Sequence, residues 1–290
     1  MASGPTSSTV QAWELGLRLR EHRERLGLTA ASVARTTGIG STNLSVMESG
    51  KRRLTAAKLR DLVEVYRLDD AERRELEELR EQADQREWWY DYAHLFPEDF
   101  VRLLGLEAGA DRISEFAPDI VPGLLQTADY ARAVMRAGTP CTGPVDIGPR
   151  LETRLARQAR LVGTYALKLD VLLGEAALRQ VVGGPEVMRG QLAHLLHVIA
   201  KRPDHVRVRV MPFSAGAHPL LGAGLRIMSF PSGRLRDLVY QETAISGAVV
   251  DKRQVILEST ASFAEAFDRA LDEEGSRGFI GDVREEVERL

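Results

Sequence analysis

The chain has 290 residues, more than one typical domain, and a slightly acidic net charge of −3. Its hydrophobic content of 44% and charged content of 28% are those of an ordinary globular protein, and no apolar run approaches the length of a membrane span. The single cysteine, Cys141, can form neither an internal disulfide nor, by itself, a cysteine-based metal site, so a reducing cytoplasm is expected and a disulfide-rich or membrane protein is excluded.

The chain begins with a Ser/Thr-rich stretch, residues 1–10, that lacks the basic start and apolar middle of a signal peptide. We expect it to be a disordered tail. Residues 11–68 then form a series of short helices with apolar residues at helical spacing. Thr29 and Thr55 are placed to cap two of these helices, and Gly27, Gly38 and Gly50 follow the ends of three. Helices this short are not stable alone, so they must pack together.

The helical segment 11–68 carries eleven basic and six acidic residues, a net charge of +5. Because residues 1–10 are uncharged, the rest of the chain must carry −8. A small basic module is thus joined to a larger acidic one. This asymmetry concentrates any attraction for DNA phosphates on the N-terminal module.

The pattern of residues 26–51 has the spacing of a helix-turn-helix. Its elements are Leu26-Gly27-Leu28-Thr29, Val33-Ala34, Gly38-Ile39, Leu44 and Met47-Glu48-Ser49-Gly50-Lys51. The segment resembles the Xre family, that is, the lambda-repressor-like helix-turn-helix. The resemblance implies an N-terminal all-α domain that binds double-stranded DNA with its third helix in the major groove.

The same resemblance assigns roles to individual residues. It implies that the bases are contacted by Ser41, Thr42, Asn43 and Val46. It implies that phosphates are bound by Ser49, Lys51 and Arg53, with Arg52 as a helper. Arg23 and Glu48 match a buried ion pair between the first and third helices, although an exposed charge is the alternative for Arg23.

Two departures from the family pattern reduce the direct contacts with bases that we expect. Ala30 stands where the family often has Gln, and the third helix contains no Arg, Lys or Gln. Phosphate contacts, DNA shape and the spacing of paired sites should therefore carry more of the recognition. One module of this size binds DNA weakly, so we expect a homodimer.

Residues 69–87 consist almost entirely of Glu, Arg, Gln, Asp and Leu. We interpret them as a solvated, charged helical linker. A coiled coil is the alternative, but only Leu76, Leu79 and Ala83 supply apolar positions.

Residues 88–290 open with the aromatic cluster Trp88, Trp89, Tyr90 and Tyr92 and are predicted to form an α+β domain with a mixed sheet. We expect a helix over residues 92–104 and strands near residues 111–116, 166–173, 206–210, 224–230, 236–243 and 246–250. Most of the remaining segments are predicted helices, including 127–137, 150–161, 252–272 and 279–289.

This second part is similar to a C-terminal domain of undefined activity in many actinobacterial, antitoxin-like regulators. The resemblance is carried by Glu115, Pro118, residues 121–127, Tyr130-Ala131, Arg150, Arg154, Arg157, Gln158, Pro212-Phe213, residues 216–219, Phe230-Pro231, Tyr240 and Glu242-Thr243. It implies a regulatory or partner-binding unit. The candidate ligand- or partner-binding residues are Glu115, Gln126, Tyr130, Arg154, Arg157, His218 and Glu242.

Each of these candidates has a simpler explanation. The loop around Pro122 can be a structural turn, and the three arginines of residues 150–157 share one helix face that can be solvated. His218 has no second histidine at metal-ligand spacing, and Glu242 can be a charge at a strand end. We expect no metal and no cofactor.

No nucleotide-binding glycine loop, Gly-x-Ser-x-Gly elbow or paired His–Glu metal motif is present, so the chain is not expected to be an enzyme. The sequence predicts a sequence-specific, nucleoid-associated transcriptional regulator whose C-terminal domain senses a small ligand or binds a partner protein. The alternatives are an antitoxin-like module that neutralises a small partner, and an enzyme localised on DNA.

Overall fold

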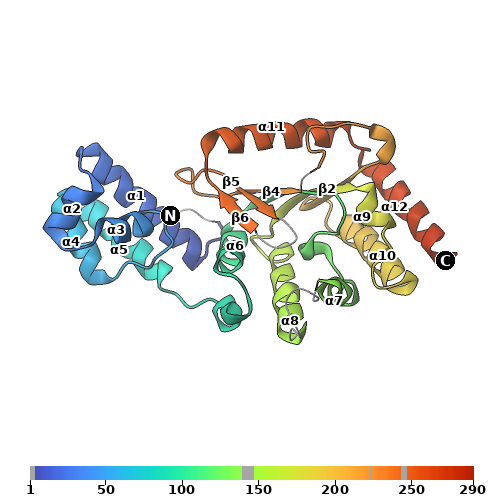
Figure 1. The fold of residues 1–290 in the computed structure, drawn as a ribbon, viewed down its shortest axis with the longest axis horizontal. Coiled ribbons are helices and arrows are strands. Elements are labelled where there is room, and N and C mark those ends of the chain that lie inside the picture. Colours follow the sequence, from blue (N-terminus) through green and yellow to red (C-terminus); the bar gives the residue numbers. More distant parts are fainter. Residues whose placement is uncertain (1–3, 139–146, 223, 243–246) are drawn as a thin grey trace.

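The computed structural model describes residues 4–138, 147–222, 224–242 and 247–290. Cys141 and Thr243, named above, lie outside these ranges. Figure 1 shows an N-terminal group of helices beside a larger part in which helices flank a sheet. None of the described helices combines the length and hydrophobicity that a bilayer crossing requires.

The N-terminal group consists of five helices: α1 (Ser8–Arg25), α2 (Ala30–Thr37), α3 (Ser41–Glu48), α4 (Ala56–Tyr66) and α5 (Asp70–Ala83). Thr29 caps α2 by accepting a hydrogen bond from the Ser32 N–H at 3.1 Å, and Thr55 caps α4 in the same way. Gly38 takes the left-handed conformation, with φ of 70°, that ends α2 and turns the chain into α3. Their buried side chains form one core, which includes Leu19, Leu44 and Leu62.

The expected disordered tail is wrong for residues 7–10. Ser7 caps α1, and its hydroxyl donates to the Gly105 carbonyl at 2.6 Å. Val10 is buried in the core of the second domain, so the start of α1 is ordered by contacts that lie about a hundred residues away in sequence. A local sequence pattern does not reveal such contacts.

The expected solvated linker is also wrong for residues 70–83. Helix α5 packs along α1, and Leu76 is fully buried in the same core as Leu19 and Leu44. Arg18 of α1 also forms an ion pair with Glu75 at 2.5 Å. The helix is therefore an integral fifth helix of the N-terminal domain.

The C-terminal part contains a six-stranded mixed sheet with strand order β3-β2-β1-β4-β5-β6. Its strands are β1 (Arg112–Ala117), β2 (Lys168–Gly174), β3 (Val206–Met211), β4 (Leu225–Ser229), β5 (Leu238–Glu242) and β6 (Gly247–Val250). Strands β1, β2 and β3 run parallel to one another, whereas each later strand is antiparallel to its neighbour: β4 to β1, β5 to β4 and β6 to β5. The α+β class predicted from the sequence, with a mixed sheet, is confirmed.

The sheet is covered on both faces. The helices of this part are α6 (Glu98–Gly109), α7 (Ala128–Ala137), α8 (Ile147–Arg157), α9 (Glu175–Arg179), α10 (Pro185–Lys201), α11 (Arg253–Arg269) and α12 (Glu273–Glu288). Short 3-10 helices occur at Trp88–Leu95, Gly123–Leu125, Gln158–Leu161 and Phe213–Ala215. Figure 1 shows α11 on one face and α7 to α10 on the other.

The helix expected over residues 92–104 is in fact two elements, a 3-10 helix that ends at Leu95 and the helix α6 that begins at Glu98. Pro97 separates them and holds Phe96 in an extended conformation, as the residue before a proline usually is.

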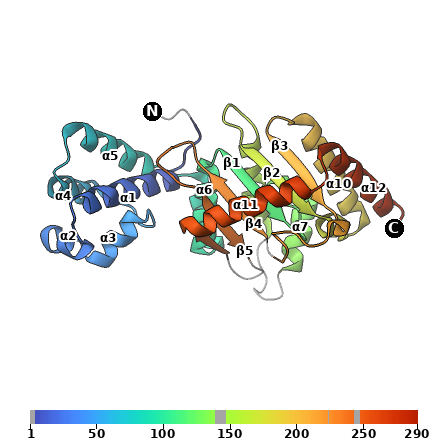
Figure 2. The same cartoon turned by 90° about the horizontal axis from the view of Figure 1, so that it is seen from above.

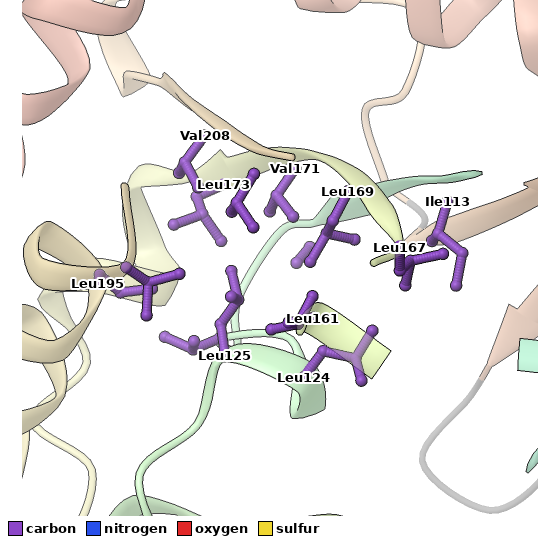
Figure 3. Close-up of a cluster of buried hydrophobic side chains, with 14 of the residues drawn as sticks. Ile113, Leu124, Leu125, Leu161, Leu167, Leu169, Val171, Leu173, Leu195 and Val208 are labelled. Carbon is purple, nitrogen blue, oxygen red and sulfur yellow. The ribbon is translucent and has the colours of Figure 1, made fainter. Parts of the chain in front are cut away.

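The main core lies on the α10 face of the sheet. Side chains of β2 face Leu124, Leu125 and Leu161 across this core, as Figure 3 shows for Leu169 and Leu173. Because successive strand residues face opposite sides, Glu115 shares this face whereas Phe116 faces α11.

The two parts meet where α1 crosses α6, and Figures 1 and 2 show these helices adjacent between them. A Cβ added at Gly105 would lie only 1.9 Å from the Thr9 hydroxyl oxygen, so a glycine is needed for this close crossing. Trp13 contacts Phe230 edge to face at 5.3 Å between ring centroids. Both parts of the chain therefore share α1.

Candidate nucleic-acid interface

Helix α3 has one buried and one exposed side. Leu44 and Met47 are buried in the core of the N-terminal domain, whereas Ser41, Thr42 and Asn43 are exposed at the amino end of the helix. Val46 is partly buried. The residue before the helix is Gly40, which has no side chain to accept a hydrogen bond from the first N–H groups of α3.

The Arg23 and Glu48 side chains meet, as the sequence suggested. The guanidinium donates to both carboxylate oxygens of Glu48, at 2.7 and 2.9 Å, and to the Leu28 carbonyl at 2.9 Å. The hydrogen bond to Glu48 raises the pKa of Arg23. This pair fixes the position of α3 relative to α1.

The basic loop, residues 49–53, follows α3, and its side chains have different surroundings. Lys51 is exposed, and the Ser49 hydroxyl donates to the Val46 carbonyl at 2.8 Å. The Arg52 guanidinium donates to the Asn43 side-chain oxygen and so orients that carboxamide. This contact joins a residue expected to bind phosphate to one expected to contact a base.

Arg53 points toward the second domain. Its guanidinium lies 5.1 Å from the centre of the Tyr90 ring and 3.9 Å from the Asp84 carboxylate. Burial alone would raise the pKa of Tyr90, but the polar groups of Ser8, Arg53 and Thr9 near its hydroxyl, together with the positive charge of Arg53, outweigh burial and lower the pKa. Arg53 therefore belongs to the basic loop and also contacts residues at the junction of the two domains.

Two of the candidates in the C-terminal domain, Glu115 and Arg157, lie in one buried network, and two others, Arg154 and Gln126, bond to each other. Glu107, only 1% exposed, accepts two hydrogen bonds from Arg157, each at 2.7 Å, and one from Arg226 at 3.0 Å. Arg226 also binds both oxygens of Glu115, at 2.9 and 3.1 Å. Arg154 donates to the Gln126 side-chain oxygen at 2.7 Å.

The charges in this network support one another. Despite burial, Arg157 and Arg226 hold the pKa of Glu107 below its ordinary value. Burial would lower the pKa of Arg226, but Glu115 and Glu107 raise it. Among the described residues Arg154 has no such carboxylate contact, and burial lowers its pKa to about 10. The network links α6, α8, β1 and β4 and occupies the interior of the domain.

The other candidates do not join this network. Tyr130 is fully buried, and its hydroxyl accepts a hydrogen bond from the Val121 N–H at 3.4 Å. His218 packs edge to face on Phe116, which faces α11, at 5.4 Å between ring centroids. Glu242 is exposed at the end of β5. The seven residues proposed from the sequence therefore do not line one open site.

Glu107 and Arg226 were not predicted from the sequence. Both are charged residues inside apolar patterns, Glu107 after Leu103, Leu104 and Leu106, and Arg226 between Leu225 and Ile227. A charged residue on the buried side of an amphipathic element requires a partner of opposite charge. This requirement is the sequence signal that could have identified both residues.

The comparisons with known proteins agree with this two-part architecture. Residues 14–76 match the family described as "Helix-turn-helix domain", and residues 100–282 match the family described as "Domain of unknown function (DUF5753)". The second match covers more than half of the chain. The chain belongs to the DUF5753 family.

The helix-turn-helix match indicates a DNA-binding regulator, and it extends through Leu76 of α5. The DUF5753 match begins within α6 and includes the whole sheet and its buried network. The searches of curated proteins and of solved structures found no match.

Proposed function

We propose that this chain is a sequence-specific transcriptional regulator in which α3 binds the major groove of DNA and the DUF5753 domain controls that binding in response to a small ligand or a partner protein. The observation that carries the proposal is the exposed amino end of α3 beside a basic loop, with the rear of the helix buried. A recognition helix enters the groove with its first residues toward the bases.

The exposed residues suit base contacts of moderate strength. The hydroxyls of Ser41 and Thr42 and the carboxamide of Asn43 can bond base edges, and the Val46 methyl groups can contact thymine. The bond from Arg52 orients the Asn43 carboxamide before DNA arrives. The proposal retains the Xre-type binding mode suggested by the sequence.

Phosphate contacts would come mainly from Lys51 and Arg52, with Ser49 close by. Arg53 would join them only when its guanidinium leaves Tyr90. Because one helix-turn-helix contributes few such contacts, a homodimer on a paired site would supply the affinity that a single copy lacks.

The phosphate assignment is tested by Lys51→Gln in the full chain, with Lys201→Gln, an exposed substitution at the end of α10, as the control. Affinity for all duplexes should fall, and the slope of log K against log salt should decrease by about 1, because one phosphate contact is lost. An unchanged slope would contradict the assignment.

Thr42→Ala and Asn43→Ala test base contacts on a site selected from a random duplex pool. Each should reduce discrimination against single-base variants of that site, by up to ~1–3 kcal/mol per position, more than it reduces general affinity. A uniform loss on all sequences would remove these residues from base recognition.

A further inference from the structure

The junction of the two domains contains a cleft of about 390 Å³. Its lining includes Ser8 and Thr9 of α1, Lys51 and Arg53 of the basic loop, Tyr90, and Arg102 of α6, and we call it the junction cleft. This volume is in the range of pockets that hold small metabolites. The cleft lies outside the buried network of Glu107.

Three of the six residues are cationic, and they come from both domains. Within the described ranges, neither the Arg102 nor the Lys51 side chain forms an ion pair or a hydrogen bond. Burial lowers the pKa of Arg102, and the nearby charges of Asp251 and Asp99 offset this only in part. A partly buried guanidinium with unused donors favours an anion.

The cleft also contains two carboxylates, Glu98 and Asp99. Both lie in the first turn of α6, where the helix dipole stabilises negative charge. Neither forms an ion pair with the three cations within 4.0 Å among the described residues. Among the residues that line the cleft, the cations therefore exceed the acids by one, while Asp84 beside Arg53 and Asp251 near Arg102 lie outside the lining. The hydroxyls of Ser8, Thr9 and Tyr90 add polar partners.

We propose that the junction cleft binds a small phosphate-bearing metabolite, with Arg102 and Arg53 holding the phosphate and Lys51 adding a third positive charge. Arginine is suited to this role because its planar guanidinium can donate two parallel hydrogen bonds to a phosphate. This inference rests on the proposed function, since it assigns the effector site of the regulator.

The site also explains how a ligand would affect DNA binding. Lys51 belongs both to the cleft and to the basic loop that would contact the DNA backbone. A ligand phosphate and a DNA phosphate compete for the same cation, so each lowers the affinity of the other, and linkage makes the effect reciprocal.

Pyrophosphate is the probe, added to the full chain at constant ionic strength with chloride as the balancing anion. The wild-type Tm should rise saturably with pyrophosphate concentration. Arg102→Gln should raise the half-saturating concentration at least about tenfold, the cost of a lost charge-assisted hydrogen bond. Arg102→Lys should retain part of the response, and Arg189→Gln, on the exposed side of α10, should retain all of it.

DNA binding provides the second readout, with a generic duplex at low salt. Pyrophosphate should weaken wild-type binding about fivefold or more and should have little effect on Arg102→Gln. Without pyrophosphate, Arg102→Gln should bind the duplex as the wild type does.

Three results would overturn the inference: no saturable rise in Tm, an equal rise in the wild type and Arg102→Gln, or a loss of DNA affinity in Arg102→Gln with a flatter salt dependence. The last would assign the cleft to the DNA backbone. If the wild type ignores duplex DNA but its pyrophosphate response depends on Arg102, the site stands and the proposed function fails.

Discussion

Glu107 is a carboxylate placed between two guanidiniums in the interior of the DUF5753 domain. Removing such a charge from water costs several kcal/mol, and only strong pairing offsets that cost. Arg157 and Arg226 both form ion pairs with Glu107, and Arg226 also forms an ion pair with Glu115. The stability of this domain therefore depends on the charge of one buried side chain.

Glu107→Gln should lower the free energy of unfolding by about 3–5 kcal/mol at neutral pH, because it leaves two buried arginines short of negative charge. Urea denaturation of the full chain measures the change. Glu285→Gln on α12 is the control, since that residue is exposed and should change the stability by less than about 0.5 kcal/mol.

The effect of Glu107→Gln should also depend on pH. The folded protein holds the pKa of Glu107 below its unfolded value, so the stabilisation is present above about pH 4.3 and is lost as the pH falls through the folded pKa. The difference between the wild type and Glu107→Gln should therefore shrink below about pH 4. A difference that stays constant or grows on acidification would contradict this.

The partners of buried charges were only partly predictable. The spacing of Arg154 and Arg157 correctly placed them on one side of a helix, but Glu107 lies fifty residues before Arg157. Nothing local connects two such positions, because their contact is made only when α6 and α8 pack on the sheet. The pair of Arg23 and Glu48 was predicted because the resemblance to a family motif, rather than local spacing, connected the two positions.

At the level of elements, α5 shows how composition can mislead. Apart from alanines, the helix has two apolar residues, Leu76 and Leu79, which favoured a solvated spacer. Leu76 is nevertheless fully buried, and Leu79 packs against the same core. A narrow apolar side is enough to pack α5 into the domain, because α1 provides most of the surface that it contacts. The short helices α2 to α4 were easier to predict, since capping threonines and terminal glycines mark their ends.

Leu76→Ala tests whether α5 belongs to the N-terminal domain. It should destabilise this domain by about 2–5 kcal/mol, as expected when a leucine is removed from a packed core. Urea denaturation followed by far-ultraviolet circular dichroism measures the loss. Glu78→Ala, on the exposed side of the same helix, should be nearly neutral. Equal behaviour of the two variants would restore the spacer interpretation.

Across the whole molecule, α1 is the element that both cores share. Val10 and Trp13 lie in the core of the DUF5753 domain, whereas Leu15 and Leu19 lie in the core of the helical domain. The Arg23–Glu48 pair extends the connection to α3. The sequence predicted the contrast between a basic and an acidic part, but not this shared helix, because the apolar pattern of α1 does not say which core each residue enters.

A shared helix predicts that the two domains unfold together. In the wild type, circular dichroism and tryptophan fluorescence should give the same urea midpoint. Trp13→Ala removes the contact with Phe230 and a buried side chain worth about 3–5 kcal/mol, so it should separate the two transitions, with the helical domain unfolding first. Fluorescence then reports Trp88 and Trp89, which adjoin α6.

Trp88→Phe is the matched control for this experiment, because Trp88 is 38% exposed and its replacement keeps an aromatic ring. Its two midpoints should remain coincident. Separate midpoints in the wild type, or coincident ones in Trp13→Ala, would mean that α1 does not couple the domains.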